Sequence, residues 1–488
     1  MKKTFNLVKK VSVFMLAGLL LFTGCAETTG NTITNNTETT DNTNNDGSTE
    51  ENTDNENTDN SSNENSENSE TNTEETESNS ETNTEETESN SETNTEETES
   101  NSENNTETNP NQSESTTEDF ETNLTSVQMA KNMSIGWNLG NTLDATYYQD
   151  SEYNAGLDTE IGWEMPKTTK EMITSVREAG FKTIRIPVSW HNHISDITNY
   201  TIDSAWMARV KEVVDYAYSQ GMYVIINIHH DNMKITTINS AAGFALSDNA
   251  DVRKKSKTFI KNVWLQIATT FADYNEKLVF EVLNEPRDVG GEFCGNEWWT
   301  DNKAMVDIIT EYEQVAIDAI RSVKGNKNRF IMVPGYAASG SDINILKLYT
   351  MPTDSSNDKL ILSTHAYSPY NFAMNDSTDK TFGSDDKASL DSIFAALKSN
   401  YTDKGIGVVM GEASASDKNN LSDRVEWATY YFTKAKEAGI PVILWDNMVT
   451  VENGGNIDSG ECHGYYDRNE NSWFFPTMIT AMMNAVRN

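Results

Sequence analysis

Eight short runs of β-forming, mostly apolar residues recur from about Leu124 onward, and they constrain the fold more than any other feature of the sequence. The runs are MSIGWNLG, KTIRIPVSW, MYVIINIHH, LVFEVLNEP, RFIMVPG, LILSTHAY, GVVMGEA and PVILWDN. Stretches with helical periodicity separate them, for instance 169–179, 204–219, 252–274, 305–323 and 424–438. Gly180, Gly221 and Gly439 stand where helix C-caps are expected. Because parallel strands need such crossovers, the pattern predicts an α/β fold, a (β/α)8 TIM barrel.

The acidity of the chain belongs mainly to a tail that precedes this pattern. The 488 residues carry a net charge of −39, but residues 26–119 hold 28 acidic residues and no Lys or Arg. The sequence ETNTEETESNS repeats in tandem over 70–102 and contains no apolar residue, so residues 26–119 are predicted to be a disordered linker, extended by its own charge. Residues 120–488 remain for the barrel, and no basic patch indicates nucleic acid.

The first 25 residues are predicted to be a targeting segment rather than part of the fold. Four lysines precede the apolar run VSVFMLAGLLLF, and Thr23, Gly24 and Cys25 follow it. This order resembles a bacterial lipoprotein signal, in which Cys25 would be acylated, although Phe22 stands where Leu is usual. A plain signal peptide is the alternative. Both predict export, either lipid-anchored at the bacterial cell surface or secreted, and nothing after Cys25 is apolar for long enough to span a bilayer.

Two of the predicted strands deliver a carboxylate at their C-terminal ends. LVFEVLNEP carries Asn284 and Glu285 just before its last residue, and GVVMGEA carries Gly411 and Glu412 just before its last residue. Barrel enzymes build their active sites at these ends, and two carboxylates are the minimal equipment for glycoside hydrolysis. Further polar and aromatic residues at the predicted strand ends are Asn138, Asn141, Arg185, His229, His230, Tyr336, His365, Tyr367, Trp445 and Asp446.

The motifs at these ends resemble one family in their order along the chain. GWNLGNTLDA, IRIPVSW, NIHHD, LNEP, THAY, GEAS and LWDN look like glycoside hydrolase family 5, especially its clostridial and rumen endoglucanase branch, over about 124–487. The resemblance implies a retaining endo-β-1,4-glucanase (cellulase) with Glu285 as acid/base and Glu412 as nucleophile, so the carboxyl groups should lie about 5 to 5.5 Å apart. It implies these substrate-binding residues: Asn141, Arg185, His229, His230, Asn284, His365, Tyr367 and Trp445.

Charge and hydrogen bonding suggest how these residues act together. Arg185 nearby would keep Glu412 ionised, and Tyr367 would donate a hydrogen bond to it. Glu285 must begin protonated, which a neighbouring carboxylate in a half-buried cleft favours. Asn284 would hold the sugar 2-hydroxyl, and Trp445 would offer an apolar face to the ring. Trp163, Trp298 and Trp299 are either further stacking platforms or core aromatics.

Two departures from the family pattern bear on the substrate. The family usually has Phe-Gly after the nucleophile, where this chain has Ala413 and Ser414, and the loop EIGWEMP around Trp163 also differs. A hydrolase acting mainly on xyloglucan, mixed-linkage β-glucan, xylan or mannan therefore remains an alternative, as does a non-catalytic surface carbohydrate-binding protein.

No metal or other cofactor is expected. A metal centre built on His229 and His230 is disfavoured because adjacent residues on a strand point to opposite faces. Cys294 and Cys462 are expected to be free thiols; a disulfide between two loops of one barrel face is the alternative.

The expected partner is a β-glucan polysaccharide, and the protein is expected to be a monomer. The sequence leaves open whether the Asn-x-Thr/Ser triplets of the linker are glycosylated.

Overall fold

The computed structural model describes residues 118–146, 156–375 and 378–487. Eight parallel strands close into a barrel in the order β1-β10-β9-β8-β7-β6-β5-β2. They are β1 Ile135–Asn138, β2 Thr183–Ile186, β5 Tyr223–Asn227, β6 Leu278–Glu281, β7 Ile331–Ser339, β8 Leu360–His365, β9 Gly407–Ala413 and β10 Val442–Leu444. Each lies within one of the eight runs of the sequence or, for β7, extends beyond it, so the predicted (β/α)8 barrel is confirmed.

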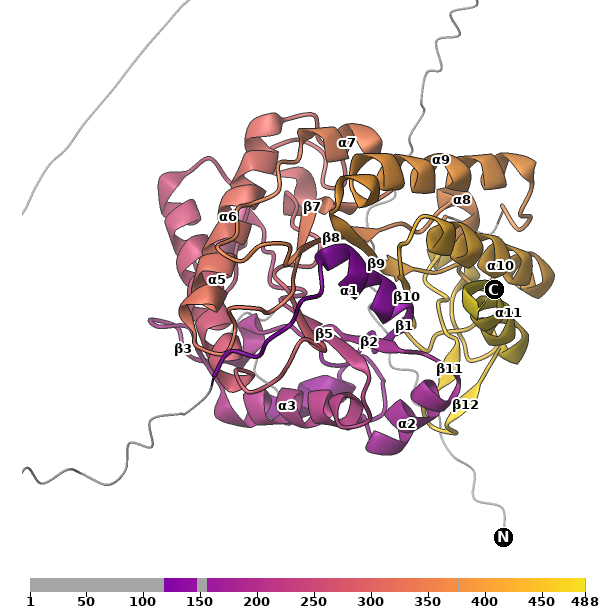
Figure 1. Ribbon diagram of the computed structural model, residues 1–488, viewed down its shortest axis with the longest axis horizontal. Helices are drawn as coiled ribbons and strands as arrows, with labels where there is room; N and C mark the ends of the chain where they lie inside the picture. The colour runs from indigo at the N-terminus through magenta and orange to yellow at the C-terminus, as the bar shows by residue number, and fades with distance from the viewer. Residues whose placement is uncertain (1–117, 147–155, 376–377, 488) are drawn as a thin grey trace, which may run out of the picture. The chain divides into compact units, whose positions relative to one another are not determined.

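Helices surround the barrel in the described part of the chain (Figure 1). They are α1 Ser126–Met133, α2 Lys170–Glu178, α3 Ser204–Tyr218, α4 Ile235–Ile238, α5 Ala250–Thr270, α6 Lys303–Ser322, α7 Ile343–Leu348, α8 Tyr370–Ala373, α9 Ser384–Asn400, α10 Leu421–Glu437 and α11 Pro476–Arg487. Short 3-10 turns, η1 to η5, span Gly156–Ile161, His191–His193, Val289–Gly291, Thr402–Lys404 and Ile457–Ser459. Two hairpins, β3 Ile194–Asp196 with β4 Thr201–Ile202 and β11 Tyr466–Asp467 with β12 Ser472–Trp473, lie outside the barrel sheet.

The predicted glycine caps are present. Gly180, Gly221 and Gly439 have φ of +115°, +80° and +74°, a backbone region that side chains other than glycine avoid. Each lies just past the end of α2, α3 or α10 and turns the chain toward the next strand. The opposite ends of α2 and α3 are capped by Thr169 and Asp203, whose side chains accept backbone N–H bonds of the first turn.

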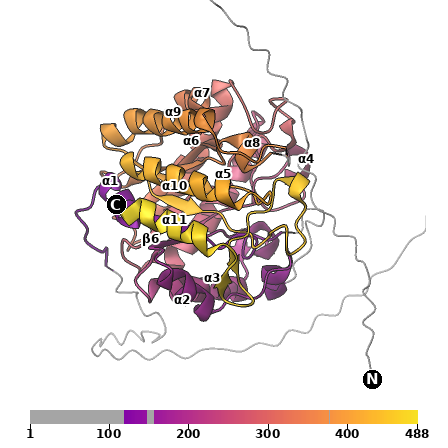
Figure 2. The ribbon, with the colours of Figure 1, turned by 90° about the vertical axis from the view of Figure 1, so that its right-hand side faces the viewer.

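Two apolar layers follow the period of two along each strand. On β5, Val224 and Ile226 point into the main core between barrel and helices, whereas Ile225 points into the barrel interior. The interior cluster also contains Met129 and Met133 of α1. Figure 1 shows α1 crossing the barrel opening, and Figure 2 shows α9, α10 and α11 side by side on one flank.

Helix α1 fills the N-terminal end of the barrel closely. The Gly407 N–H at the start of β9 donates to Ser126 Oγ at 3.0 Å, and a Cβ atom at Gly407 would lie 2.3 Å from the Ser126 carbonyl oxygen. Glycine is therefore the residue that lets α1 approach the strand. With this end occupied, the opposite end, where the strands terminate, is the place for a binding site.

The folded region begins slightly earlier than the sequence suggested. Asp119, predicted as the last linker residue, accepts hydrogen bonds from the N–H groups of Gly325 and Lys327 at 2.8 and 3.1 Å. The side chain of Asn328 donates to the Phe120 carbonyl oxygen at 2.7 Å. The predicted signal segment 1–25 and linker residues 26–117 lie outside the described residues.

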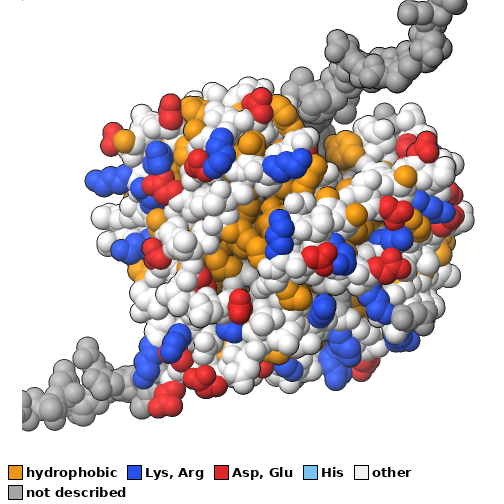
Figure 3. Space-filling view, turned by 45° about the horizontal axis from the view of Figure 1, so that its top comes forward, with side chains coloured by type: hydrophobic (Ala, Val, Ile, Leu, Met, Phe, Trp, Pro, Cys, Tyr) orange, Lys and Arg blue, Asp and Glu red, His pale blue; other side chains and the backbone are white. Residues whose placement is uncertain are grey.

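Charged side chains of both signs are interspersed on the face of the molecule in Figure 3. Among the described residues, none of the helices is both long enough and apolar enough to cross a membrane.

Candidate active site

Glu412 lies near the C-terminal end of β9, where it is nearly buried between two hydrogen-bond donors. Arg185 Nη1, at the end of β2, donates to Glu412 Oε1 at 2.7 Å, and the Tyr367 hydroxyl donates to Oε2 at 2.7 Å. A cation and a phenol on its two oxygens stabilise the ionised form and fix the orientation of the carboxylate. Glu412 is thus prepared to act as an anion.

Glu285 follows β6 and lies close to Glu412. One carboxylate oxygen of each residue and a ring nitrogen of His365 all lie within 4.8 Å of one another. Glu285 Oε1 is 2.8 Å from His365 Nδ1, and His365 Nδ1 is 3.8 Å from Glu412 Oε2. Carboxyl groups of retaining glycosidases lie about 5 to 5.5 Å apart, whereas inverting enzymes separate them by roughly 6.5 to 9.5 Å to admit a water. The geometry fits the retaining class.

The electrostatic setting of Glu285 differs from the expectation that a neighbouring carboxylate keeps it protonated. Burial raises the pKa of Glu285, but the hydrogen bond and charge of His365 and the charges of Arg287 and His230 bring that pKa below its ordinary value. The neighbouring carboxylate, Glu412, is paired with Arg185 at 2.7 Å. Burial lowers the pKa of His365, but the charge of Glu412 and the hydrogen bond and charge of Glu285 together raise that pKa above its ordinary value. The 2.8 Å hydrogen bond places one proton between His365 Nδ1 and Glu285 Oε1.

A third buried acid, Glu281, binds Arg185, the same residue that holds Glu412. The sequence analysis did not identify it. Glu281 Oε2 accepts hydrogen bonds from Arg185 Nε and Asn227 Nδ2, both at 2.8 Å, and Oε1 accepts from the Ser363 hydroxyl at 2.6 Å. With no exposed surface, its charge has to be matched by Arg185. An ionisable residue inside an otherwise apolar strand, VFEVL, was the available signal.

Asn138 and Asn284 complete the surroundings of Arg185. Arg185 Nη1 donates to Asn138 Oδ1 at 3.0 Å, and Nη2 donates to Asn284 Oδ1 at 2.6 Å. Because the amide oxygen of Asn284 accepts from Arg185, its NH2 group is turned away from the guanidinium as a donor. This orientation agrees with the predicted contact of Asn284 to a sugar hydroxyl.

The protonation of His229 follows from its neighbour Asn227. The Asn227 Oδ1 accepts from the Val188 N–H at 3.1 Å, and Nδ2 donates to Glu281 and faces His229 Nδ1 at 3.0 Å. His229 Nδ1 is therefore the acceptor, and its proton resides on Nε2. Burial lowers the pKa of His229 well below its ordinary value, so the ring is neutral and offers one N–H donor.

His229 and His230 lie on the same side of the barrel end, which corrects the expectation that they point to opposite faces. Their ring centroids are 4.3 Å apart. Strand β5 ends at Asn227, so the alternation of a strand no longer applies to these residues. The Trp445 ring lies parallel to His229 at 6.0 Å, and the Trp163 ring is 5.7 Å from His230. Two imidazoles and two indoles thus line one part of the site.

The described residues contain two clusters with metal-ligand atoms close together. In one, atoms of Asp144, His229 and His230 lie within 4.8 Å. Both Asp144 oxygens accept backbone N–H bonds, and His229 carries its proton on Nε2, so these groups are arranged for hydroxyl hydrogen bonding rather than for an ion. The other is Glu285, His365 and Glu412, where Arg185 and Tyr367 already hold the Glu412 oxygens.

Other predicted positions have different surroundings. Asn141 is partly exposed, in a left-handed conformation (φ 58°), and its N–H donates to Asp144. Tyr336 and Asp446 belong to the scaffold: the Tyr336 hydroxyl donates to the Glu297 carbonyl oxygen, and Asp446 accepts from the Trp137 indole at 2.8 Å. Trp298 and Trp299 are exposed, so they are not core aromatics.

The replacement of the family's usual Phe-Gly by Ala413 and Ser414 has a local explanation. Ser414 Oγ contacts His463 Nδ1 at 2.9 Å and the Tyr465 hydroxyl at 3.0 Å. The His463 ring packs on Tyr367 at 5.4 Å, and Tyr367 in turn holds Glu412. Ser414 therefore occupies a buried polar network behind the nucleophile.

Glu461 is a further acid near the pair that the sequence analysis did not identify. Its side chain is exposed at the surface of the site. Partial desolvation by the surrounding protein, together with the charges of Glu285 and Glu412, raises its pKa to about 7. It lies directly before Cys462 in the loop after β10, where no sequence motif distinguishes it. Cys462 and Cys294 are both free thiols, as expected.

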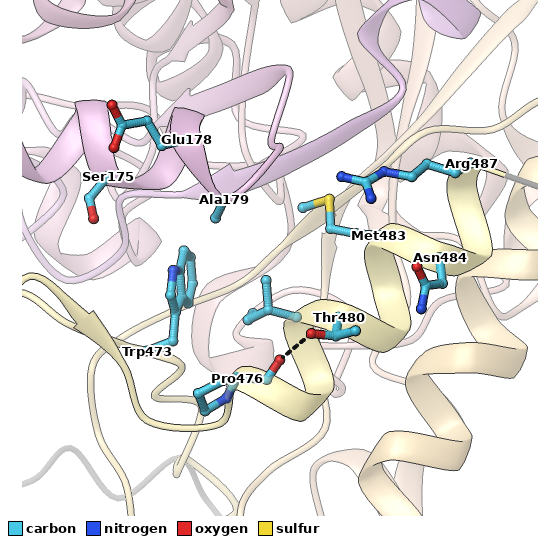
Figure 4. A pocket seen from close by; sticks show the side chains of 10 residues that line it. Ser175, Glu178, Ala179, Trp473, Pro476, Thr480, Met483, Asn484 and Arg487 are labelled. Carbon is cyan, nitrogen blue, oxygen red and sulfur yellow. Dashed lines mark hydrogen bonds between the residues drawn. The ribbon is translucent and has the colours of Figure 1, made fainter.

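A groove of about 340 Å³ lies elsewhere, between α2, the β12 segment and α11 (Figure 4). Trp473 and Met483 line it together with Glu178 and Arg487. It contains none of the residues at the barrel strand ends, so the chemistry described above belongs to the C-terminal face of the barrel and not to this groove.

Several known proteins with similar sequences are cellulases or endoglucanases. The profile of the family described as Cellulase (glycosyl hydrolase family 5) matches residues 146–450. Cellulase/esterase CelE of Acetivibrio thermocellus is 40% identical over 365 residues, which cover 74% of this chain and 41% of that protein. Endoglucanase B of Ruminococcus albus is 40% identical over 361 residues, covering 73% of this chain and 80% of that protein. The chain thus spans less than half of the first relative and most of the second.

Solved structures with the same architecture include two that hold oligosaccharides. A mutant glycoside hydrolase 5 lichenase from Caldicellulosiruptor sp. F32 in complex with cellotetraose has a TM-score of 0.67 and 40% identity, covering 76% of this chain and 98% of its own. A GH5-4 broad specificity endoglucanase from Ruminococcus champanellensis with bound cellotriose has a TM-score of 0.67 and 37% identity, covering 74% and 99%.

Proposed function

The chain belongs to the cellulase family, glycosyl hydrolase family 5, and from that membership we propose that it is an endo-β-1,4-glucanase that hydrolyses cellulose and related β-glucans with retention of anomeric configuration. The observation that carries the proposal is the placement of two carboxylate oxygens, one of Glu285 and one of Glu412, within 4.8 Å at the C-terminal end of the barrel. That spacing suits direct attack by one carboxylate and is shorter than the roughly 6.5 to 9.5 Å of inverting enzymes.

In the first step, an ionised oxygen of Glu412 attacks the anomeric carbon while the bond to the leaving glucan oxygen breaks. Arg185 and Tyr367 aim the carboxylate and leave it the anion that the attack requires. The leaving oxygen takes a proton from Glu285, which shares that proton with His365 at 2.8 Å. The product is a glycosyl ester on Glu412.

In the second step, Glu285 removes a proton from water, and the water oxygen attacks the anomeric carbon and releases Glu412. Two inversions give net retention. Asn284 is turned to donate to the sugar 2-hydroxyl, and the neutral His229 donates from Nε2 to another hydroxyl of the same ring. Trp445, His230 and Trp163 line the neighbouring positions. Asn141 donates its N–H to Asp144, which lies beside His229 and His230.

The test combines substrate range with product stereochemistry. Carboxymethylcellulose, mixed-linkage glucan, xyloglucan, xylan and mannan are assayed side by side for release of reducing ends, and the first-formed anomer is read by NMR. We expect a β-anomer and the highest activity on one of the β-glucans. An α-anomer would exclude the nucleophilic role of Glu412, and inactivity on every polysaccharide would favour a carbohydrate-binding protein.

Mixed-linkage β-glucan is the second candidate substrate. One solved relative is a lichenase and another a broad specificity endoglucanase. Ser414, one of the two residues that replace the family's usual Phe-Gly, belongs to a buried polar network with His463 and Tyr465.

We also propose that residues 1–25 direct export and that Cys25 carries a lipid that anchors the protein at the bacterial cell surface. The order of lysines, apolar run and Thr-Gly-Cys supports this. Metabolic labelling with a fatty-acid analogue should mark the wild-type chain and not Cys25→Ser. An unlabelled wild type found in the medium would indicate a plain signal peptide instead.

A further inference from the structure

Arg287 follows Glu285, the proposed acid/base residue, by two positions and also contacts it in space. Its Nη1 lies 3.8 Å from Glu285 Oε2 and donates to the backbone oxygen of Glu285 at 3.0 Å. Its own N–H donates to Asn232 Oδ1 at 2.8 Å. The guanidinium therefore has a fixed place beside the Glu285 carboxylate.

The loop that follows holds this guanidinium from two further directions. Arg287 Nε donates to Glu297 Oε1 at 2.9 Å, and the Trp298 ring lies 4.0 Å from the guanidinium carbon. Glu297 is held in turn, because its Oε2 accepts the Gly290 N–H at 2.9 Å. An ion pair and a cation–π contact on one cation restrict its movement away from Glu285.

The charges in this group are only partly screened by solvent. The side chains of Glu285, Arg287 and Glu297 are 17%, 18% and 27% exposed. Charges about 4 Å apart at such a depth interact more strongly than in water. Arg287 thus acts on Glu285, and Glu297 balances part of the charge of Arg287.

We propose that Arg287 is a positioning residue for the catalytic proton: its guanidinium, held by Glu297 and Trp298, determines how firmly Glu285 keeps its proton. This rests on the proposed glycosidase function, in which Glu285 is the acid/base. Burial raises the pKa of Glu285, whereas His365, Arg287 and His230 lower it, in agreement with this role.

Several titratable or charged groups surround Glu285. These groups lie on five different parts of the barrel end. They are His230 after β5, Arg287 after β6, His365 and Tyr367 at and after the end of β8, Glu412 on β9, and Glu461 after β10. His365, Tyr367 and Glu412 belong to the catalytic machinery. Arg287 differs from them because it has an acidic partner, Glu297, which can be neutralised separately. Its effect can therefore be both removed and increased.

The test is the pH dependence of kcat/KM on a soluble β-glucan. The basic limb reports loss of the proton that the first step needs. Arg287→Met removes the cation, so Glu285 keeps its proton longer and the basic limb should move up by roughly one pH unit. Glu297→Gln removes the balancing anion, so the limb should move down, by roughly half as much. Arg287→Lys keeps a cation but loses part of its fixed place, so its basic limb should move up less than that of Arg287→Met.

Opposite shifts in the two variants support the proposal. A loosened loop would instead lower the rate at all pH values or move both limbs the same way, and either result in folded variants overturns it. Calorimetry checks folding, and Glu297→Gln, which changes one charge and little shape, keeps the test open if Arg287→Met is unstable.

Failure of the proposed function has a different signature. If the wild type cleaves no polysaccharide, the function is wrong. The proton affinity of Glu285 is then read without turnover by NMR titration of its carboxyl carbon in the same variants. An unchanged titration midpoint overturns the role of Arg287 whether or not the protein is a glucanase.

Discussion

At the scale of single residues, the two catalytic carboxylates receive different partners. Glu412 is bound by a guanidinium and a phenol, and Glu285 by an imidazole and, more distantly, a second guanidinium. The partners of Glu412 suit an anionic nucleophile, and the partners of Glu285 suit a carboxyl group that gives up and regains a proton. A double displacement requires one carboxyl group of each kind.

The roles of the two glutamates can be separated with a substrate that needs no proton donor. In Glu285→Ala, hydrolysis of polysaccharide should fall by roughly 100- to 10,000-fold. A dinitrophenyl cellobioside should still form the glycosyl-enzyme, and added azide should restore turnover as a β-glycosyl azide. Glu412→Ala should be almost inactive on every substrate. Reversed behaviour of the two variants, followed by product NMR, would mean that the roles are exchanged.

Glu281 is expected to matter for both stability and rate, although it has no route to the substrate. Glu281→Gln leaves Arg185 with one carboxylate fewer in a fully buried place, which should cost about 3 kcal/mol in the free energy of unfolding. Without the hydrogen bond to Glu281, the Arg185 guanidinium should no longer be held in its orientation toward Glu412. We therefore expect kcat to fall by a larger factor than KM rises.

The matched control for this change is Ser363→Ala, which removes one hydrogen bond to Glu281 and keeps the charge. It should cost about 1 kcal/mol and leave kcat nearly unchanged. Urea unfolding and steady-state kinetics measure both variants. Wild-type values for Glu281→Gln would show that the Glu281 charge does not support the site.

At the scale of elements, the strands position the site, whereas the helices contain buried groups that affect the stability of the fold. One lies on α6: Glu313 is fully buried, and its Oε2 accepts a hydrogen bond from the Tyr349 hydroxyl at 2.6 Å. Its Oε1 has no hydrogen-bond partner among the described residues. Burial raises the pKa of Glu313 well above its ordinary value, so this carboxyl is neutral in the folded protein.

This group makes stability depend on pH. Above the ordinary glutamate pKa the unfolded chain loses the proton while the folded chain keeps it, so the contribution of Glu313 is complete at low pH and declines as pH rises toward its folded-state value. Glu313→Gln should remove that decline. Its melting temperature should match the wild type near pH 4.5 and exceed it by roughly 1 to 2 °C near pH 8, the change expected for about 1 kcal/mol in a folded region of this size. Equal melting temperatures at both pH values in calorimetry would contradict a buried neutral carboxyl.

At the scale of the whole molecule, the barrel and the preceding acidic segment are expected to be independent. Residues 26–117 contain almost no large apolar side chains and so have little to bury. The contacts of Asp119 with Gly325 and Lys327 place the start of the folded region just after this segment.

Deletion of residues 26–117 should therefore leave the specific activity and the melting temperature unchanged. Extending the deletion through Asp119 removes two hydrogen bonds to the loop before β7 and should lower stability by about 1 kcal/mol. The two deletions, compared by calorimetry, differ by two residues only. A melting temperature lowered by several degrees in the shorter deletion would show that part of the segment packs on the barrel.

The sequence by itself determined the architecture and the candidate catalytic pair. Strand runs, helical periodicity and glycine caps are local features, so eight βα units could be counted without coordinates. Glu285 and Glu412 could be found because each follows a buried strand and because parallel strands bring such ends together. The assigned roles rest on resemblance and remain for the mutants to test.

Only the tertiary structure decided how these residues act on one another. The contacts of Arg185 with Glu281 and Glu412 join residues 96 and 227 positions apart, which no local pattern encodes. The tautomer of His229, the common side of His229 and His230, and the shared proton of Glu285 and His365 depend on neighbours from different strands. Hydrogen bonds and buried charges depend on distance and direction in space, and closure of the barrel sets both.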